Sequence, residues 1–169
     1  MNFINRCKEV YYAFEGKTKT GKAKYFASKK PTSDKAKLVS ELPEEFEFYE
    51  NPANATVTIR RRKASQVTTA ELELLTRICS ELTRSACRVV IEGDNLVVYT
   101  ALVSFAANFE PEMQFSLVDR NLRTFTASRY CYRSSMDGWM KLHYQPCDLN
   151  SLATHLVKHL GKESFFEQF

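Results

Sequence analysis

The chain has 169 residues and a mass of 19.5 kDa, and 44% of its residues are hydrophobic and 12% aromatic. This composition provides enough apolar material for one or two small domains and excludes a chain that is disordered beyond its loops and ends. The amino end has no apolar stretch of signal-peptide length, and the uncharged run at 96–109 is shorter than the roughly 20 residues of a membrane span. We therefore expect a soluble protein with no membrane partner.

The cysteines are odd in number, widely spaced and free of any C-x-x-C pair. This usage is typical of a reducing compartment, whereas a disulfide framework would show paired spacings. We therefore expect a cytoplasmic protein in which most cysteines are small core residues. The five are Cys7, Cys79, Cys87, Cys131 and Cys147.

The formal net charge of +4 is unevenly distributed along the chain. Residues 1–63 contain 14 Lys and Arg against 8 Asp and Glu, which gives +6. Residues 64–169 contain 10 against 12, which gives −2. The basic character therefore belongs to the first third of the chain, and it indicates an acidic partner for that part.

Two hairpins are predicted in the first third. Aromatic-rich segments at 9–14 and 24–28 flank a polar stretch with two glycines, and alternating segments at 46–50 and 55–61 flank the turn sequence NPAN. Pro31 punctuates the connection between the two pairs. The pattern predicts a small antiparallel sheet over residues 1–63.

A helix is predicted to begin directly after this sheet. Thr68 and Glu71 have the spacing of a capping box, and Val67 and Leu72 that of a hydrophobic staple. At about 100° per residue, one face of this helix is apolar. That face contains Leu72, Leu75, Ile78, Cys79, Leu82 and Ala86.

The remaining chain predicts a second sheet closed by a second helix. Strands are expected in a hairpin over 87–101 and then within 113–119, 122–133 and 139–144, with Trp139 as an anchor of the core. The last helix is expected over 148–160, with Gly161 as its left-handed C-cap. Its buried stripe contains Leu149, Leu152, Leu156 and Leu160. The fold class is therefore α+β, with domains at 1–63 and 64–169.

The stretch GKTKTGKA at 16–23 fits the first seven positions of a phosphate-binding loop. The eighth position is Ala23, where Mg²⁺ binding needs Ser or Thr, and Pro31 leaves too little room for the helix whose amides would face the phosphates. The stretch therefore predicts a turn, and no nucleotide site.

The lysines around this turn support two interpretations. Cations beside aromatic residues are typical of nucleic-acid binding on a sheet. Lysines also keep hairpin edges soluble, and aromatic residues also form cores. The same alternatives apply to the basic run at 60–63, and because this run ends a strand just before a helix, a solvated linker is the simpler interpretation. The candidate nucleic-acid-binding residues are Lys17, Lys19, Lys22, Lys24, Tyr25, Lys29, Lys30, Arg60, Arg61 and Arg62.

Metal and catalytic sites have weaker signals. His155 and His159 are four apart on the predicted last helix, and His143 precedes Cys147 by four residues, but this spacing matches no common zinc finger. The serines at 134–135 lack the glycine pattern of a nucleophile elbow. We therefore expect surface histidines, no cofactor, no metal and no catalytic residue.

Four strings carry a resemblance: KTKTGKAKYFASKKP, LPEEFEFYENP, SSMDGWMKL and HLGKESFFEQF. Through them the chain resembles a family of uncharacterised bacterial proteins that share a lysine-rich hairpin and a carboxyl-terminal LG-x-ESFFE segment. The resemblance implies a two-part architecture and a bacterial cytoplasmic setting, and it implies no activity.

These observations favour a non-enzymatic binding module whose basic hairpin contacts an acidic partner, with nucleic acid as one such partner. The alternative is a protein–protein adaptor that uses the hairpin and the carboxyl-terminal tail. An enzyme with a cleft between the two domains is least favoured, because no acid, base and nucleophile converge in the pattern. The sequence leaves the oligomeric state open.

Overall fold

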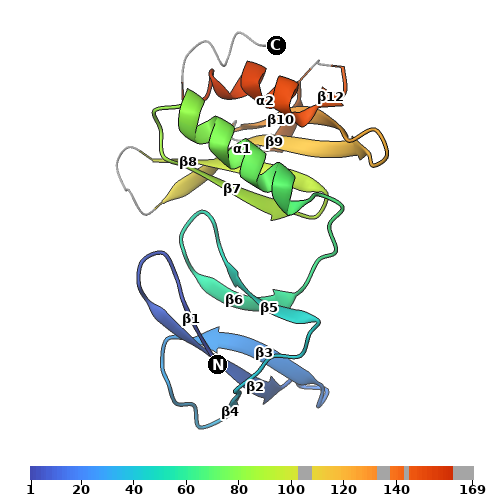
Figure 1. The fold of residues 1–169 in the computed structure, drawn as a ribbon. Helices are drawn as coiled ribbons and strands as arrows, with labels where there is room; N and C mark the ends of the chain where they lie inside the picture. Colours follow the sequence, from blue (N-terminus) through green and yellow to red (C-terminus); the bar gives the residue numbers. More distant parts are fainter. Residues whose placement is uncertain (103–107, 133–137, 143–144, 162–169) are drawn as a thin grey trace. The chain divides into compact units, whose positions relative to one another are not determined.

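The computed structural model describes residues 1–102, 108–132, 138–142 and 145–161 of the chain. The chain divides into two compact units, unit 1 (Met1–Arg62) and unit 2 (Lys63–Phe169). Strands alone make up the regular structure of unit 1, whereas unit 2 combines strands with two helices (Figure 1).

Unit 1 contains two antiparallel sheets. In the first, β2 pairs with β3 along one edge and with both β1 and β4 along the other. In the second, β5 pairs with β6 alone. The strands are β1 (Asn2–Ile4), β2 (Val10–Lys17), β3 (Ala23–Ser28), β4 (Lys37–Leu38), β5 (Phe46–Glu50) and β6 (Val57–Arg61).

The sequence predicts one small sheet here, and the presence of two sheets with two additional strands corrects that expectation. β1 and β4 have three and two residues, which is too short for any alternation to be visible in the sequence. β4 pairs with a distant part of the chain, with Leu38 opposite Phe14, so local patterns do not contain that pairing. β1 pairs with the next strand, with Ile4 opposite Val10, and only its shortness hides it.

The two sheets of unit 1 are joined through the turn after β1. Phe3 stacks on Phe48 of β5 at 5.4 Å between ring centroids. The buried Asn5 donates to the carbonyl of Ala55 at 2.8 Å. Arg6 Nη1 donates to Glu50 Oε1 at 2.6 Å and to the Asn51 carbonyl at 3.0 Å, and Arg6 Nη2 donates to the Pro52 carbonyl at 2.8 Å. These contacts fix the β5–β6 hairpin against the first sheet.

Unit 2 is a mostly antiparallel sheet with two helices, which confirms the α+β class. Its strand order is β11-β10-β9-β8-β7, so each strand of the path neighbours the next in sequence, and β12 pairs with β10. Gly93, at φ +63°, lies in the turn between β7 and β8. The elements are α1 (Thr69–Leu82), β7 (Cys87–Glu92), β8 (Asn95–Ala101), β9 (Phe109–Asp119), β10 (Thr124–Cys131), β11 (Gly138–Lys141), β12 (Cys147–Asp148) and α2 (Leu149–Val157).

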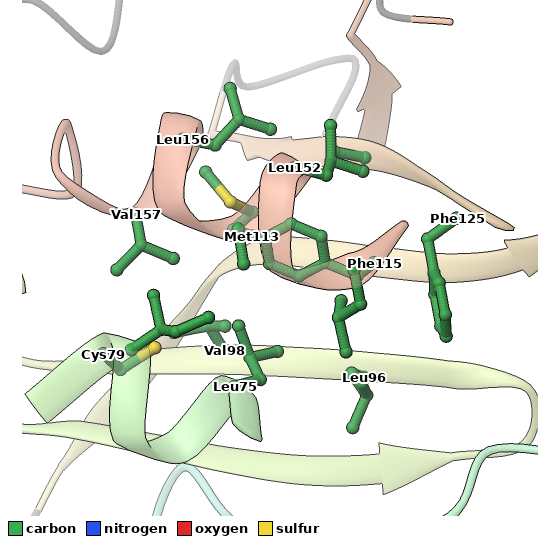
Figure 2. Close-up of a cluster of buried hydrophobic side chains, with 14 of the residues drawn as sticks. Leu75, Cys79, Leu96, Val98, Met113, Phe115, Phe125, Leu152, Leu156 and Val157 are labelled. Atoms are coloured by element: carbon green, nitrogen blue, oxygen red, sulfur yellow. The ribbon is translucent and has the colours of Figure 1, made fainter. Parts of the chain in front are cut away.

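Both helices cover the same face of this sheet. Because side chains alternate along a strand, Val98, Met113 and Phe125 project to one face, and all three are fully buried. Leu75 of α1 and Leu156 of α2 belong to the same core cluster. Figure 2 shows the side chains of both helices meeting those of β8, β9 and β10. Burial of this apolar surface is the main stabilising contribution to unit 2.

The capping box predicted for α1 is confirmed. Glu71 N donates to Thr68 Oγ1 at 3.3 Å, and Thr68 N donates to Glu71 Oε2 at 2.8 Å. The predicted length of the apolar face is wrong, however. Thr83 adopts an extended conformation that ends the helix, so Leu82 is 37% exposed and Ala86 lies beyond the helix and is exposed.

The carboxyl-terminal helix α2 is shorter than predicted. Asp148 is its N-cap, and Ser151 N donates to Asp148 Oδ1 at 2.9 Å. The helix ends at Val157 because the next amides bond to carbonyls three residues back, as in His159 N to Leu156 O. Gly161 has the expected left-handed φ of +68°.

Trp139 does not anchor the core, contrary to the expectation from sequence. Its register partner is Tyr130, which alternates with the core-facing residues of β10 and therefore lies on the face away from the helices. Trp139 packs edge-on against Tyr130 at 5.2 Å and remains 37% exposed.

None of the helices in the described ranges is long and apolar enough to cross a membrane.

Candidate polyanion-binding hairpin

The β2–β3 hairpin contains most of the candidate residues, and its tip is a hydrogen-bonded turn. The strands pair from Tyr12 opposite Ser28 to Lys17 opposite Ala23. Thr18 N donates to Lys22 O at 2.8 Å, and Gly21, at φ +79°, donates to Thr18 O at 2.9 Å. A strand follows this turn where a phosphate loop would continue into a helix.

Four exposed lysines surround the hairpin tip. Lys17 ends β2, Lys19 and Lys22 lie in the turn, and Lys24 lies in β3. None of them forms an ion pair within the described part of the chain. Lys24 is opposite Gly16, the neighbour of Lys17, so these two lysines project to opposite faces of the hairpin. The tip is therefore cationic on both faces.

Lys29 and Lys30 follow the hairpin and differ from each other in environment. Lys29 Nζ lies 2.5 Å from Glu9 Oε1 and 5.5 Å from the centroid of the Tyr11 ring. The hydrogen bond from Lys29 lowers the pKa of Glu9, and the same bond raises the pKa of Lys29. Lys30 is exposed and belongs to none of the ion pairs of residues 1–62, all of which the structure describes.

The arginines at the end of β6 are held by their own hairpin. Arg60 Nε donates to Glu47 Oε1 at 2.9 Å, and its guanidinium lies 3.7 Å from the centroid of the Tyr49 ring. Arg61 lies 5.4 Å from the Phe46 ring centroid, and Arg62 Nε donates to the Phe46 carbonyl at 3.3 Å. Arg60 is therefore neutralised locally, whereas the two exposed arginines contact only a ring and a carbonyl.

The aromatic residues of unit 1 are used for internal packing. Tyr25 contacts Phe46 at 4.8 Å between ring centroids, so it lies close to the residue that Arg61 also contacts. Phe14 and Phe26 stack at 5.6 Å, and Phe14 is 1% exposed. Within residues 1–62, every one of which is described, each aromatic side chain is buried or half-buried. Tyr25 is thus part of the packing between β3 and β5.

Sequence reasoning missed two lysines that the fold brings to this hairpin. β4 pairs with the free edge of β2 and places Lys37 opposite Glu15. Ala36 lies beside Gly16, since a Cβ on that glycine would be 3.7 Å from the Ala36 Cβ. Lys35 directly precedes this contact, and both lysines are exposed. The available signal was composition, because residues 16–37 contain 8 lysines and 1 aspartate.

The histidines and serines weighed for metal binding and catalysis are only partly described. His155 and His159 lie side by side on α2, with 6.2 Å between ring centroids. No group of three or more metal-ligating side chains is gathered among the residues that the structure describes. His143, the serines at 134–135 and the tail at 162–169 lie outside the described residues.

The cysteines are free thiols in different environments. Cys7 is exposed, Cys79 is buried in the core, and Cys87 is half-buried. A hydrogen bond with Cys87, together with burial, raises the pKa of the Cys79 thiol, and the same bond lowers the pKa of Cys87. Cys79 is therefore held as a neutral thiol inside unit 2.

No family model, curated protein or solved structure gives a significant match to this chain. The functional assignment therefore rests on the residues and geometry described above.

Proposed function

We propose that the protein is a non-enzymatic binding module that uses the β2–β3 hairpin to bind the phosphates of nucleic acid. The observation that supports this proposal is the selective absence of carboxylate partners at the hairpin tip. Arg6, Lys29 and Arg60 each form an ion pair within unit 1. The cations of the tip do not, and they are exposed. They are Lys17, Lys19, Lys22 and Lys24.

Unpaired lysines are suited to this role for an electrostatic reason. A lysine that neutralises a phosphate releases a condensed counterion, so each contact adds roughly 0.7 to 0.9 to the slope of log affinity against log salt. Lysine offers a point charge without the planar fork of arginine, so such contacts position the backbone and read no bases. Binding through the hairpin is therefore expected to be independent of sequence.

The ligand-facing set is narrower than the sequence suggested. Arg60 and Lys29 are assigned to the structure of unit 1, because each already faces a carboxylate and a ring. Tyr25 is assigned to packing. Lys30, Arg61 and Arg62 remain in the proposed binding set with the four tip lysines, because they are exposed and form no ion pair within unit 1.

The test is fluorescence anisotropy with labelled single- and double-stranded DNA and RNA at several salt concentrations. The variant replaces Lys17, Lys19, Lys22 and Lys24 by Gln, and we expect its salt slope to fall by roughly 2.8 to 3.6. The matched control replaces four exposed cations of unit 2 by Gln: Arg77, Arg84, Lys141 and Lys158. Thermal melting of both variants shows whether folding survives.

The outcomes are distinct. The proposal is supported if the parent and the unit 2 control bind nucleic acid at low salt and the hairpin variant does not. No binding by the parent at low salt, or equal loss in both variants with unchanged melting, would contradict it.

A protein–protein adaptor remains the second proposed function, and one observation favours it. Tyr132 and Trp139 are 53% and 37% exposed, and both pack on Tyr130, on the face of the sheet away from the helices. Exposed aromatic side chains are enriched at protein interfaces. Such an interface weakens little with added salt, whereas phosphate binding weakens steeply, so the salt series separates the two functions.

A further inference from the structure

The pairing of β4 with β2 brings a second group of lysines beside the hairpin. Glu15 of β2 lies between Lys37 on one edge and Tyr25 on the other, because both are its register partners. One residue further along β2, Gly16 lies between Ala36 and Lys24. Lys35 and Lys37 therefore flank the end of the hairpin that carries Lys17.

The combined surface is dominated by positive charge. Residues 16–37 contain 8 lysines, of which only Lys29 forms an ion pair within unit 1. The acids nearest in sequence are Glu15 and Asp34, and neither forms an ion pair there. The unpaired lysines are Lys17, Lys19, Lys22, Lys24, Lys30, Lys35 and Lys37.

The packing of the aromatic residues bears on which form of nucleic acid this surface suits. Proteins that bind single strands stack bases on open aromatic rings, and each stacked base contributes about 1–3 kcal/mol. The rings of Tyr25 and Phe26 are instead paired with Phe46 and Phe14. The structure describes all of residues 1–62, and each aromatic side chain in this range is buried or half-buried. A single strand would thus meet lysines without a stacking surface.

A duplex provides closely spaced phosphates and needs no aromatic ring for its bases to stack on. It carries one phosphate charge per roughly 1.7 Å of helix axis, and its bases are already stacked. The major groove of B-form DNA is wide enough to admit a two-stranded β-ribbon. The β2–β3 hairpin is such a ribbon, with cations on both faces of its tip.

We propose that the phosphate-binding surface extends from the hairpin tip onto β4 through Lys35 and Lys37, and that its ligand is double-stranded nucleic acid. This inference rests on the proposed function and adds to it the class of ligand and two binding residues. Lys35 and Lys37 contact phosphates beside those reached by the tip.

The experiment compares a labelled short DNA duplex with a labelled single-stranded thymidine homopolymer of equal length, which has no secondary structure. Anisotropy titrations over a salt series use the parent, Lys35→Gln/Lys37→Gln, Lys35→Arg/Lys37→Arg and the unit 2 control Lys141→Gln/Lys158→Gln. We expect the parent to bind the duplex at least about tenfold more tightly at equal salt. We expect the Gln pair to lower the duplex slope by about 1.8, and the Arg pair and the control to retain the parental slope.

The outcomes separate this inference from the function on which it rests. If the parent binds neither ligand at low salt, the proposed function fails and this inference fails with it. If the parent binds the homopolymer as tightly as the duplex, or if the Gln pair keeps the parental slope, the function stands and this inference is overturned. Loss of slope in the Gln pair counts only when its melting temperature matches that of the parent. If the double Gln variant has a lower melting temperature than the parent, the single variants Lys35→Ala and Lys37→Ala are measured in its place. A parental salt slope in both single variants overturns the role of Lys35 and Lys37.

Discussion

Arg60 Nε lies 2.9 Å from Glu47 Oε1, and the two residues are register partners across the β5–β6 hairpin. The arginine is thereby neutralised by its own hairpin, and its guanidinium also lies over the Tyr49 ring. Half-exposed ion pairs and cation–π contacts of this kind each stabilise by up to about 1 kcal/mol. Arg60 therefore belongs to the structure of unit 1 more than to its binding surface.

The first prediction follows from this contact. Arg60→Ala should lower the free energy of unfolding by about 1 kcal/mol and leave the salt slope of nucleic-acid binding unchanged. Lys30, which is exposed and forms no ion pair within unit 1, is the stability control, since Lys30→Ala should change stability by less than about 0.5 kcal/mol. Urea denaturation measures the first effect and anisotropy the second. If Arg60→Ala reduces the salt slope of nucleic-acid binding and leaves the free energy of unfolding unchanged, Arg60 belongs to the binding surface.

The second prediction concerns the phosphate-loop pattern. Lys22→Ala should leave ATP and GTP binding unchanged, because neither nucleotide is expected to bind the parent. The amide of Lys22 donates to Thr18 Oγ1 at 3.1 Å within the turn, and the strand β3 follows. A phosphate site at this position would need the amino end of a helix. Calorimetric titration is the measurement, and saturable nucleotide binding that Lys22→Ala abolishes would contradict it.

The third prediction concerns pH and the cap of α1. Burial raises the pKa of Glu71, but the hydrogen bonds from Arg123 and Thr68 outweigh it, so the pKa is lowered from its ordinary value of 4.5. A carboxylate with a lowered folded-state pKa stabilises the fold above its unfolded pKa, and this stabilisation is lost as the pH falls through the folded-state value. Arg123 is the main favourable partner, since its Nε donates to Glu71 Oε1 at 3.0 Å and its Nη2 donates to Glu71 Oε2.

Glu71→Gln should therefore reduce stability by about 1 kcal/mol near pH 7 and match the parent at pH values below the folded-state pKa of Glu71. Urea denaturation across a pH series measures this. The control Glu73→Gln, an exposed acid on the same helix, should differ from the parent by less than about 0.5 kcal/mol. A constant difference between Glu71→Gln and the parent at all pH values would show that the charge is not involved.

The accuracy of the sequence predictions depended on whether the information was local. The start of α1 was predictable because Thr68 and Glu71 are three residues apart and their hydrogen bonds are made within one turn. The ion pair between Arg60 and Glu47 was not predictable, because the two residues are 13 apart and only the register of β5 and β6 brings them together. Lys37 was missed for the same reason, since the two-residue strand β4 has no periodicity of its own.

The fourth prediction concerns thiol reactivity. Maleimide labelling of the native protein should modify Cys7 rapidly and leave Cys79 unmodified until the protein is unfolded. Cys7 is exposed, whereas Cys79 is buried and its pKa is raised by the hydrogen bond with Cys87 and by burial. The thiolate is the reactive form, so both access and charge protect Cys79. Peptide mass spectrometry measures each site, and equal labelling rates in the native state would contradict the burial.

The fifth prediction concerns Glu15, the one carboxylate of the hairpin strands β2 and β3. Its register partners are Lys37 and Tyr25, so it lies within the proposed binding surface. Two charges about 4 Å apart in water interact by about 1 kcal/mol, which corresponds to roughly a fivefold change in affinity. Glu15→Gln removes this repulsion of phosphate, so binding should tighten by about that factor at low salt.

Salt distinguishes this effect from a change in structure. The Debye length is about 30 Å at 0.01 M salt and about 3 Å at 1 M, so the gain should shrink as salt is added. The control Glu41→Gln removes the same charge from an exposed position outside the hairpin and should have a smaller effect. Anisotropy with the labelled duplex measures both variants. Equal tightening in the two would mean that net charge governs binding, and unchanged affinity in Glu15→Gln would place the phosphates away from the row of Lys37, Glu15 and Tyr25.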